Sequence, residues 1–289
     1  MTVKERDPLT GHLTTGHEWN GITELNTRVP RLVWIFIALT HLWALVVWVL
    51  LPAWPLLDTY TKGVLGITQK AEIDRALVAG KAERAGWLAR VEALPAEAIL
   101  ADPVLAARVN GAGQRLFGDN CGACHGRAAA GGPGFPNLAD NIWLWGSDEA
   151  TIMETLRVGI NSTHPETRVA QMPAFGKGAL LTPAEIEAVV DYARSLSTAQ
   201  GPVAGSAGSA VFAANCASCH GDAGKGNSEL GAPNLTDRDW LYGGDRASVH
   251  ASVWKGRQGW MPSWEQRLMP AERKILTVHL LAMRGAPPS

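Results

Sequence analysis

The chain has 289 residues, which is enough for about two domains of ordinary size. Its 26 basic and 27 acidic side chains nearly cancel to a formal net charge of −1, so no overall positive field favours binding to nucleic acid. Four cysteines in a chain of this length do not make a disulfide framework. All four lie in two Cys-x-x-Cys pairs, and this pattern needs a chemical explanation.

The first 31 residues are polar, and an uncharged apolar run follows at 32–51. A helix that rises about 1.5 Å per residue would cover the roughly 30 Å hydrocarbon core of a bilayer over such a run. Tryptophans lie toward both ends, where indole rings favour the lipid headgroups. The run is too long for the core of a signal peptide, and no Ala-x-Ala site follows it. The sequence therefore predicts a polar segment at 1–31 and an uncleaved, single transmembrane anchor at 32–54.

One histidine, His41, lies in the middle of the anchor. An ionisable side chain at that depth is a functional hypothesis by default. A membrane haem b usually takes two histidine ligands, and this run offers one, so a polar contact with a partner helix is the favoured interpretation. The basic residues that flank the run are too evenly distributed to orient it.

The remainder of the chain is a spacer followed by an internal repeat. Residues 55–109 are rich in Ala, Leu, Glu and Arg, which predicts a helical spacer. Residues 110–198 and 208–289 then repeat one pattern, and the small-residue segment 199–207 joins them. Strand signals are weak in both copies, so we expect two mainly helical domains with long loops.

The two copies share landmarks in the same order: a Gly-x-x-x-Phe helix, Cys-x-x-Cys-His, Pro-Asn-Leu, a glycine and Met-Pro. In the first copy these are Gly113, Phe117, Cys121, Cys124, His125, Pro136, Gly159 and Met172; in the second they are Gly208, Phe212, Cys216, Cys219, His220, Pro233, Gly256 and Met261.

Cys-x-x-Cys-His is the attachment motif for c-type haem. The two thiols add to the haem vinyl groups as thioethers, and the following histidine ligates the iron from one face. Zinc ribbons need paired motifs about 15–20 residues apart, and thioredoxin-like dithiols need a βαβ context, and neither is present. The sequence therefore predicts two covalently bound haem c groups, attached through Cys121, Cys124, Cys216 and Cys219 and ligated by His125 and His220.

The second axial ligand is predicted to be Met172 in the first copy and Met261 in the second. Each precedes a proline, which restricts the loop that would hold the sulfur over the haem face. Met153, His164 and His250 read instead as packing or surface residues. Because each repeat looks complete, we expect each methionine to serve the haem of its own repeat, although exchange between repeats stays open.

Ligation by histidine and methionine is an electron-transfer arrangement. It leaves no open position on the iron, so the expected function is to relay electrons and not to convert a small molecule. Four aromatic side chains are expected to pack around the macrocycles: Phe117, Trp143, Phe212 and Trp240. Residues 110–198 carry nine acidic and six basic side chains, which suggests that a basic donor docks there, near Asp140, Asp148 and Glu149.

Taken singly, the two repeats resemble class I cytochrome c domains. The order of the whole chain resembles the diheme subunit, of the CcoP or FixP type (subunit III), of cbb3-type cytochrome c oxidases. The segments that carry this resemblance are Trp19–Asn26 ahead of Pro30, Trp54–Gly63, Ala98–Pro103, Asp119–Cys121, His164–Phe175 and the second haem motif. Asn20 departs mildly from the family, which usually has an acidic residue there.

The resemblance implies a mainly α-helical chain with one N-terminal transmembrane helix, a helical spacer and two tandem class I cytochrome c domains. It implies an N-terminus in the bacterial cytoplasm and haem domains in the periplasm. The implied partners are a donor cytochrome c, a monohaem cytochrome subunit, and a catalytic subunit with haem b and copper that reduces oxygen. The alternatives are a stand-alone membrane diheme carrier and a diheme peroxidase, which would need an exchangeable iron position.

Overall fold

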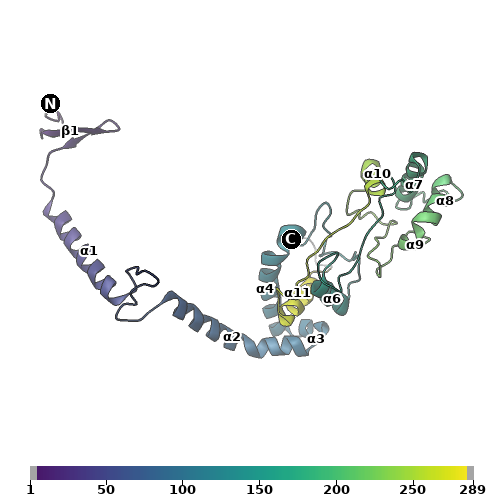
Figure 1. Cartoon of the computed structure of the whole chain (residues 1–289), viewed down its shortest axis with the longest axis horizontal. Coiled ribbons are helices and arrows are strands. Elements are labelled where there is room, and N and C mark those ends of the chain that lie inside the picture. The colour runs from purple at the N-terminus through teal and green to yellow at the C-terminus, as the bar shows by residue number, and fades with distance from the viewer. Residues whose placement is uncertain (1–4, 285–289) are drawn as a thin grey trace. The chain divides into compact units, whose positions relative to one another are not determined.

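The computed structural model describes residues 5–284, and the chain divides between Glu83 and Arg84 into two compact units (Figure 1). Each unit is described by itself. The structure is mostly helical, as expected, and the helices hold the two Cys-x-x-Cys-His motifs in similar surroundings.

The N-terminal unit begins with a two-stranded antiparallel hairpin, β1 (Thr14–Trp19) and β2 (Ile22–Leu25). Its turn residues, Asn20 and Gly21, both have positive φ, at 50° and 85°. An Asn-Gly pair at the centre of a two-residue turn matches the right-handed twist of the strands that it connects. This hairpin was not predicted, although the Asn-Gly signal was present in the polar segment.

The apolar run forms α1 (Arg31–Leu50), and none of its residues is buried. Among the described residues, α1 is the helix long and apolar enough to cross a membrane. Within it, His41 Nδ1 lies 2.8 Å from the carbonyl oxygen of Ile37. A proton on Nδ1 would satisfy that carbonyl and leave Nε2 available to a neighbour.

The predicted spacer, 55–109, is helical only from Gln69, and its last helix does not stop at residue 109. Its helices are α2 (Gln69–Ala93), α3 (Ala96–Ala101) and α4 (Pro103–Asn120). The carboxylate of Asp102 caps α4 by accepting hydrogen bonds from the backbone N–H groups of Val104 and Leu105, and Pro103 opens the first turn. The predicted domain boundary at 109/110 therefore falls inside a continuous helix.

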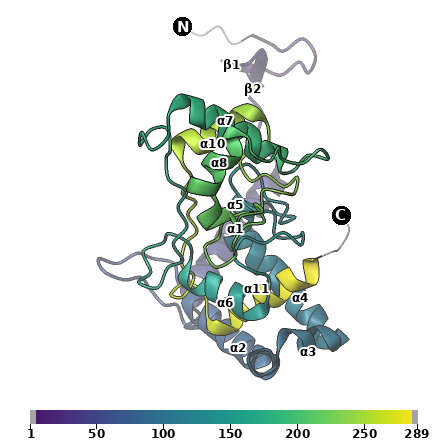
Figure 2. The same cartoon turned by 90° about the vertical axis from the view of Figure 1, so that its right-hand side faces the viewer.

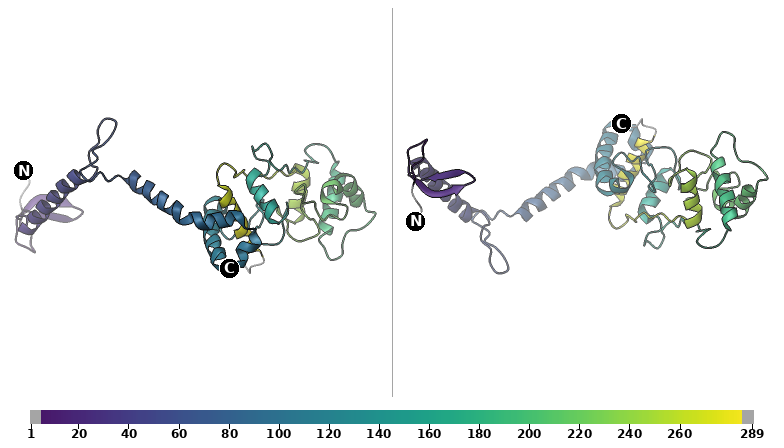
Figure 3. Two further views of the ribbon diagram at one scale, coloured as in Figure 1. Left: turned by 90° about the horizontal axis from the view of Figure 1, so that it is seen from below. Right: turned by 90° about the horizontal axis from the view of Figure 1, so that it is seen from above.

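The second unit contains two groups of helices, which we call the first lobe and the second lobe. The first lobe holds the end of α2, α3, α4, α5 (Gly122–His125), α6 (Glu149–Val158) and α11 (Pro270–Met283). The second lobe holds α7 (Pro183–Ser195), α8 (Ala207–Asn215), α9 (Ala217–His220) and α10 (Arg246–Lys255). Figures 2 and 3 show α11 beside α4, and α7 beside α8 and α10.

The lobes do not coincide with the sequence repeats. The last helix of the second repeat, α11, packs on α4 and α6 of the first repeat, and the last helix of the first repeat, α7, packs on α8 and α10 of the second. The second lobe is thus continuous in sequence from Met172 to Lys255, and the first lobe is split around it. The two repeats follow one another along the chain, as expected, but they exchange their last helices, so 199–207 joins two helices of one lobe.

Each lobe has an apolar core, and the first lobe has two. One core of the first lobe surrounds its haem motif, and the other joins the end of α2 to α3, α4 and α11 through Val91, Ile99, Leu105, Val109, Ile275 and Val278. The core of the second lobe contains Phe175, Ile186, Val189, Val190, Phe212, Val249 and Val253. The spacer therefore contributes apolar packing to the first lobe alone.

Candidate haem sites

Each Cys-x-x-Cys-His motif forms a single helical turn at the end of a longer helix. In the first lobe, the carbonyl oxygen of Cys121 accepts hydrogen bonds from the N–H groups of Cys124, at 3.1 Å, and His125, at 2.9 Å. In the second lobe, Cys216 accepts from Cys219 and His220 at the same two distances. This turn places two thiols and one imidazole on a single short segment, which is the spacing that two vinyl groups and one iron require.

The first thiol of each motif is protonated at neutral pH. Burial, together with the neighbouring cysteine, raises the pKa of Cys121 to about 11, and the same two causes raise the pKa of Cys216 to about 11. Because the thiolate is the nucleophile, neither side chain is strongly reactive in the protein without cofactor. Addition to a vinyl group is chemistry that such a thiol can undergo once a haem has been delivered to it.

Both histidines are oriented by a backbone carbonyl. The Nδ1 atom of His125 lies 3.0 Å from the carbonyl oxygen of Pro136, and Nδ1 of His220 lies 3.0 Å from that of Pro233. Burial lowers the pKa of both imidazoles, and the hydrogen bond to the carbonyl partly opposes that shift. A neutral ring with its proton on Nδ1 presents Nε2 to a metal, which is the form that ligates iron.

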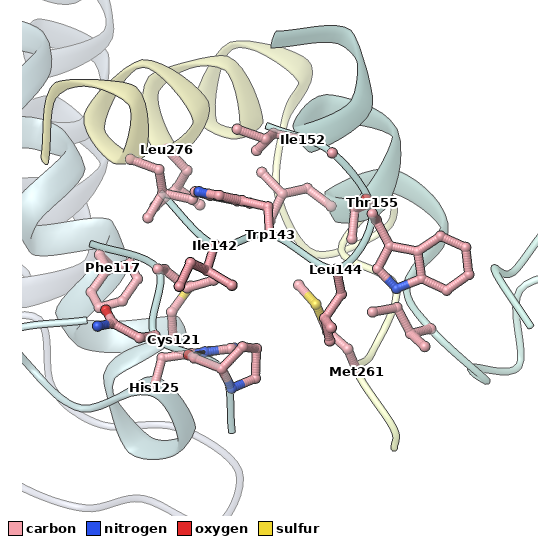
Figure 4. A pocket seen from close by; sticks show the side chains of 18 residues that line it. Phe117, Cys121, His125, Ile142, Trp143, Leu144, Ile152, Thr155, Met261 and Leu276 are labelled. Carbon is pink, nitrogen blue, oxygen red and sulfur yellow. Dashed lines mark hydrogen bonds between the residues drawn. The ribbon is translucent and has the colours of Figure 1, made fainter. Parts of the chain in front are cut away.

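A cavity that is partly open to solvent lies against the first motif (Figure 4). The lining is almost entirely apolar and includes two of the four aromatic residues expected around a macrocycle, Phe117 and Trp143. The other two, Phe212 and Trp240, lie in the apolar core around the second motif.

The methionine at the first cavity comes from the second repeat. Met261 lines the cavity together with Cys121 and His125, and Figure 4 shows Met261 and His125 on opposite sides of it. In the second lobe, Met172 packs in the core that includes Phe212 and Cys216. The expectation that each methionine serves its own repeat is therefore wrong in this structure, which places each one beside the haem motif of the other repeat.

Two pairs of backbone hydrogen bonds hold this exchange in place. Ile160 and Met261 exchange N–H···O bonds of 2.9 Å each, and Met172 and Arg257 exchange bonds of 2.8 and 3.1 Å. The preceding residues, Gly159 and Gly256, have φ values of 71° and 69°, and a Cβ on either would lie 2.5 Å from the carbonyl oxygen of the adjacent methionine. Glycine is thus required where each methionine loop crosses the other chain segment.

The remaining candidate ligands have other partners. Met153 is half-buried on α6 and does not line the cavity. His164 Nε2 lies 2.8 Å from a carboxylate oxygen of Glu265, and His250 stacks on Trp254 and lies 3.3 Å from Glu187. The expectation that these residues are not iron ligands is consistent with their surroundings.

The acids expected to receive a basic donor are mostly engaged in the fold. Asp148 caps α6 by accepting from the N–H of Thr151. Glu149 accepts from the N–H of Ala96 and pairs with Lys274. Their carboxylates stabilise the first lobe, and Asp148 remains exposed and charged, so the docking of a basic donor stays a prediction.

Sequence reasoning missed the aromatic residues that join the lobes. Trp145 lines the first cavity, and a Cβ on Gly231 of the second lobe would lie 2.4 Å from its indole. In the opposite direction, Gly134 N–H donates to the carbonyl of Leu241 at 2.8 Å, next to Tyr242. The signal was available, because Trp145 and Tyr242 each lie nine residues after the proline of Pro-Asn-Leu.

Three family profiles match the chain. Residues 11–58 match the N-terminal domain of cytochrome oxidase-cbb3, FixP; residues 111–197 match cytochrome c; and residues 203–280 match cytochrome c oxidase, cbb3-type, subunit III. The FixP subunit of a cbb3-type cytochrome c oxidase from Bradyrhizobium sp. (strain ORS 278) is 46% identical, and the match covers 97% of this chain and 98% of the relative.

The chain belongs to the FixP/CcoP family of cbb3-type cytochrome c oxidase subunits. The CcoP subunit from Azospirillum sp. (strain B510) is 41% identical over 99% of both chains, and that from Cereibacter sphaeroides is 42% identical over 94% of both. The predicted resemblance is confirmed. The protein is a cytochrome c subunit anchored in the membrane by α1, and two thiols, an oriented imidazole and an apolar cavity fit a haem c group.

Proposed function

We propose that this FixP/CcoP chain carries two covalent haem c groups and relays single electrons from a donor cytochrome c to its oxidase. The first haem would be attached through Cys121 and Cys124 with His125 and Met261 as axial ligands. The second would be attached through Cys216 and Cys219 with His220 and Met172 as axial ligands. The receiving partners would be a monohaem cytochrome subunit and the catalytic haem–copper subunit.

The observation that carries this proposal is the placement of an oriented imidazole and a thioether across one apolar cavity. A haem ligated in this way supplies a one-electron couple of raised potential. The chain itself contributes the ligands, their orientation and an apolar wall that excludes water from most of the macrocycle. With both axial positions filled, the iron offers no site to peroxide, which disfavours the peroxidase alternative.

The contact between the lobes supports a relay within the chain. The loops that follow the two haem motifs touch through Trp145 and Gly231 on one side, and through Gly134 and Tyr242 on the other. Both contacts lie within ten residues of Pro136 or Pro233, whose carbonyls orient the axial histidines. Two macrocycles held in these sites would be separated by packed protein, so electrons could pass between them without an external carrier.

We further propose that α1 crosses the bacterial inner membrane once, with the N-terminus in the cytoplasm and both lobes in the periplasm. A relay in the periplasm would meet soluble donor cytochromes there, while α1 keeps the chain beside the integral subunits of the oxidase. His41, whose Nε2 is not needed by its own helix, would make a polar contact with a helix of such a subunit.

Purification in mild detergent tests the proposal. The full chain should bring along an oxygen-reducing haem–copper subunit, and its own haem spectrum should show two low-spin haems that do not bind carbon monoxide. Isolation of the chain alone, with the same spectrum, would favour the stand-alone carrier. A carbon monoxide-reactive haem in the unmodified chain, together with peroxide reduction, would contradict the relay and support the peroxidase.

A further inference from the structure

Arg168, on the segment that runs from α6 toward Met172, is a partly buried cation that forms no direct ion pair in the described residues, although, after the larger effect of Arg157, its charge helps to lower the pKa of nearby Glu154. Its Nε atom is buried and has no hydrogen-bond partner among the described residues. Its Nη2 atom reaches the carbonyl oxygen of Thr151 only at 3.5 Å, the limit of a hydrogen bond. None of the ion pairs formed by residues 5–284 includes Arg168. A buried N–H donor left without a partner costs free energy, and an anion bound at Nε would remove that cost.

The guanidinium lies next to residues that line the first cavity, although Arg168 is not itself one of them. Its central carbon is 5.0 Å from the ring centre of Trp145, which lines the cavity. The carbonyl oxygen of Thr151 that it approaches also accepts a 2.8 Å hydrogen bond from the hydroxyl of Thr155, another lining residue. Figure 4 shows Thr155 across the cavity from Cys121. Arg168 is therefore on the side of the cavity that is remote from the attachment thiols.

A haem c group brings its own anions to that side. The thioether bonds fix the vinyl edge of the macrocycle at the cysteines, and the two propionates project from the opposite edge. Carboxylates are the groups that an arginine fork binds best, because two parallel N–H donors match two oxygens. The unpaired Nε and the weakly bonded Nη2 are adjacent donors of such a fork.

We propose that Arg168 is a positioning residue that binds a propionate carboxylate of the first haem. The inference rests on the proposed function, since it requires a haem on Cys121 and Cys124. The guanidinium would neutralise the propionate inside the protein and add a positive charge near the iron. A nearby cation disfavours the oxidised iron, so Arg168 would raise the reduction potential of the first haem relative to the second.

The corresponding arginine of the other repeat, Arg257, differs from Arg168 in its hydrogen bonds. Arg257, like Arg168, lies four residues before a methionine and stacks on the aromatic residue of its lobe, 4.1 Å from the ring centre of Tyr242. Its Nε, however, already donates to the hydroxyl of Ser252 at 2.9 Å. Arg273 also has a buried, unpaired Nε, but its Nη1 is held by the carbonyls of Glu265 and Leu268. Among these three guanidiniums, that of Arg168 has the weakest hydrogen bonding, a single contact at 3.5 Å.

Redox titration of the full, haem-loaded chain with Arg168→Gln tests the inference. Loss of the cation should shift electron sharing between the two haems by about three- to tenfold toward the second haem. Arg168→Lys keeps the charge without the fork and should give a smaller shift in the same direction. Arg267→Gln is the matched control, because it removes an arginine stacked on Trp264 in the same lobe, where the guanidinium is exposed.

The outcomes separate this inference from the proposed function. If Arg168→Gln keeps two low-spin haems and the potential of the first is unchanged, the inference fails while the relay function stands. An equal shift of the potential in Arg267→Gln would also overturn it, because the shift would then follow from the loss of any positive charge in the first lobe. If Arg168→Gln does not accumulate with its haem, Arg168→Lys decides: a lower potential of the first haem supports the inference, and a parental potential overturns it.

Discussion

The two lobes use the same parts but obtain them from the chain in different ways. In the second lobe the methionine loop and its helix α7 precede the haem motif, and the whole lobe is one continuous segment. In the first lobe the haem motif precedes its methionine in the sequence, and Met261 and α11 belong to the C-terminal part of the chain. A sequence repeat is therefore not a folding unit in this protein, because each haem site combines residues from both repeats.

The lobes also differ in their support. The first lobe has an additional apolar core, built from the end of α2, α3, α4 and α11, that has no counterpart in the core of the second. This extra core secures α11, the element that returns from the end of the sequence. We infer that the spacer stabilises the split lobe and so compensates for its discontinuity, since long-range closure costs chain entropy.

The exchange of methionines gives the largest expected effect. In a chain that carries only the first haem, through Cys216→Ala and Cys219→Ala, Met261→Ala should open the iron and allow carbon monoxide to bind. Met172→Ala in the same background should not. The reciprocal result is expected with Cys121→Ala and Cys124→Ala.

Carbon monoxide difference spectra, with a haem stain to confirm one covalent haem, make this measurement. If carbon monoxide binds to the first haem after loss of Met172, but not after loss of Met261, each methionine ligates the haem of its own repeat and the exchange is wrong.

The extra core of the first lobe predicts an effect confined to that lobe. Ile99 is fully buried, so Ile99→Ala should cost about 2–5 kcal/mol of local stability through lost burial and a cavity. Val104→Ala, at an exposed position nearby, is the control and should stay within about 0.5 kcal/mol. Hydrogen exchange should speed up in α3, α4 and α11 and stay unchanged in α7, α8 and α10. Equal acceleration in both lobes would show that they unfold together.

Gly159, where the Met261 loop crosses the other chain segment, allows the exchange of methionines to be tested by the addition of one methyl group. Gly159→Ala adds a Cβ beside the carbonyl of Met261 at a φ of 71°, so it should cost about 1–3 kcal/mol and displace the first haem's sulfur ligand. Gly118→Ala, inside α4 with open space around the new methyl group, should be neutral or stabilising by up to about 1 kcal/mol. The methionine-to-iron absorption band of each haem reports the result. Loss of the second haem's band in Gly159→Ala would argue against the crossing.

The smallest expected effect concerns the charged residues that fasten the Met261 loop. Hydrogen bonds from His164 and Arg157 lower the pKa of Glu265. A carboxylate with a lowered pKa stabilises the fold above its ordinary pKa, and this contribution is lost as the pH falls through the lowered value. Glu265→Gln should therefore weaken methionine ligation of the first haem slightly at neutral pH and flatten its dependence on acid.

Acid titration of the methionine-to-iron band checks this prediction, with the second haem as the internal control. A parental acid transition at the first haem would show that Glu265 does not hold the loop.

Much of this protein could be predicted from local sequence. An uncharged run of membrane length and a Cys-x-x-Cys-His turn are decided by neighbouring residues, so the anchor was predicted close to the bounds of α1 and the two motifs were located as single turns. The helix starts at Asp102-Pro and Thr182-Pro are equally local signals, but they were not used to place α4 and α7. The hairpin at Asn20-Gly21 also depends on a local signal, the Asn-Gly turn, but that signal was not used to predict it.

Which methionine meets which haem motif was decided only in three dimensions. The two Met-Pro loops have similar sequences, and each would satisfy either site by its chemistry, so no local pattern favours one pairing. The choice depends on Gly159 and Gly256, which let two backbones cross, and on the fit of α11 against α4 and the end of α2. The contacts of α11 with α4 join residues as much as 169 positions apart along the chain, such as Asn110 and His279, and so follow from packing and not from sequence order.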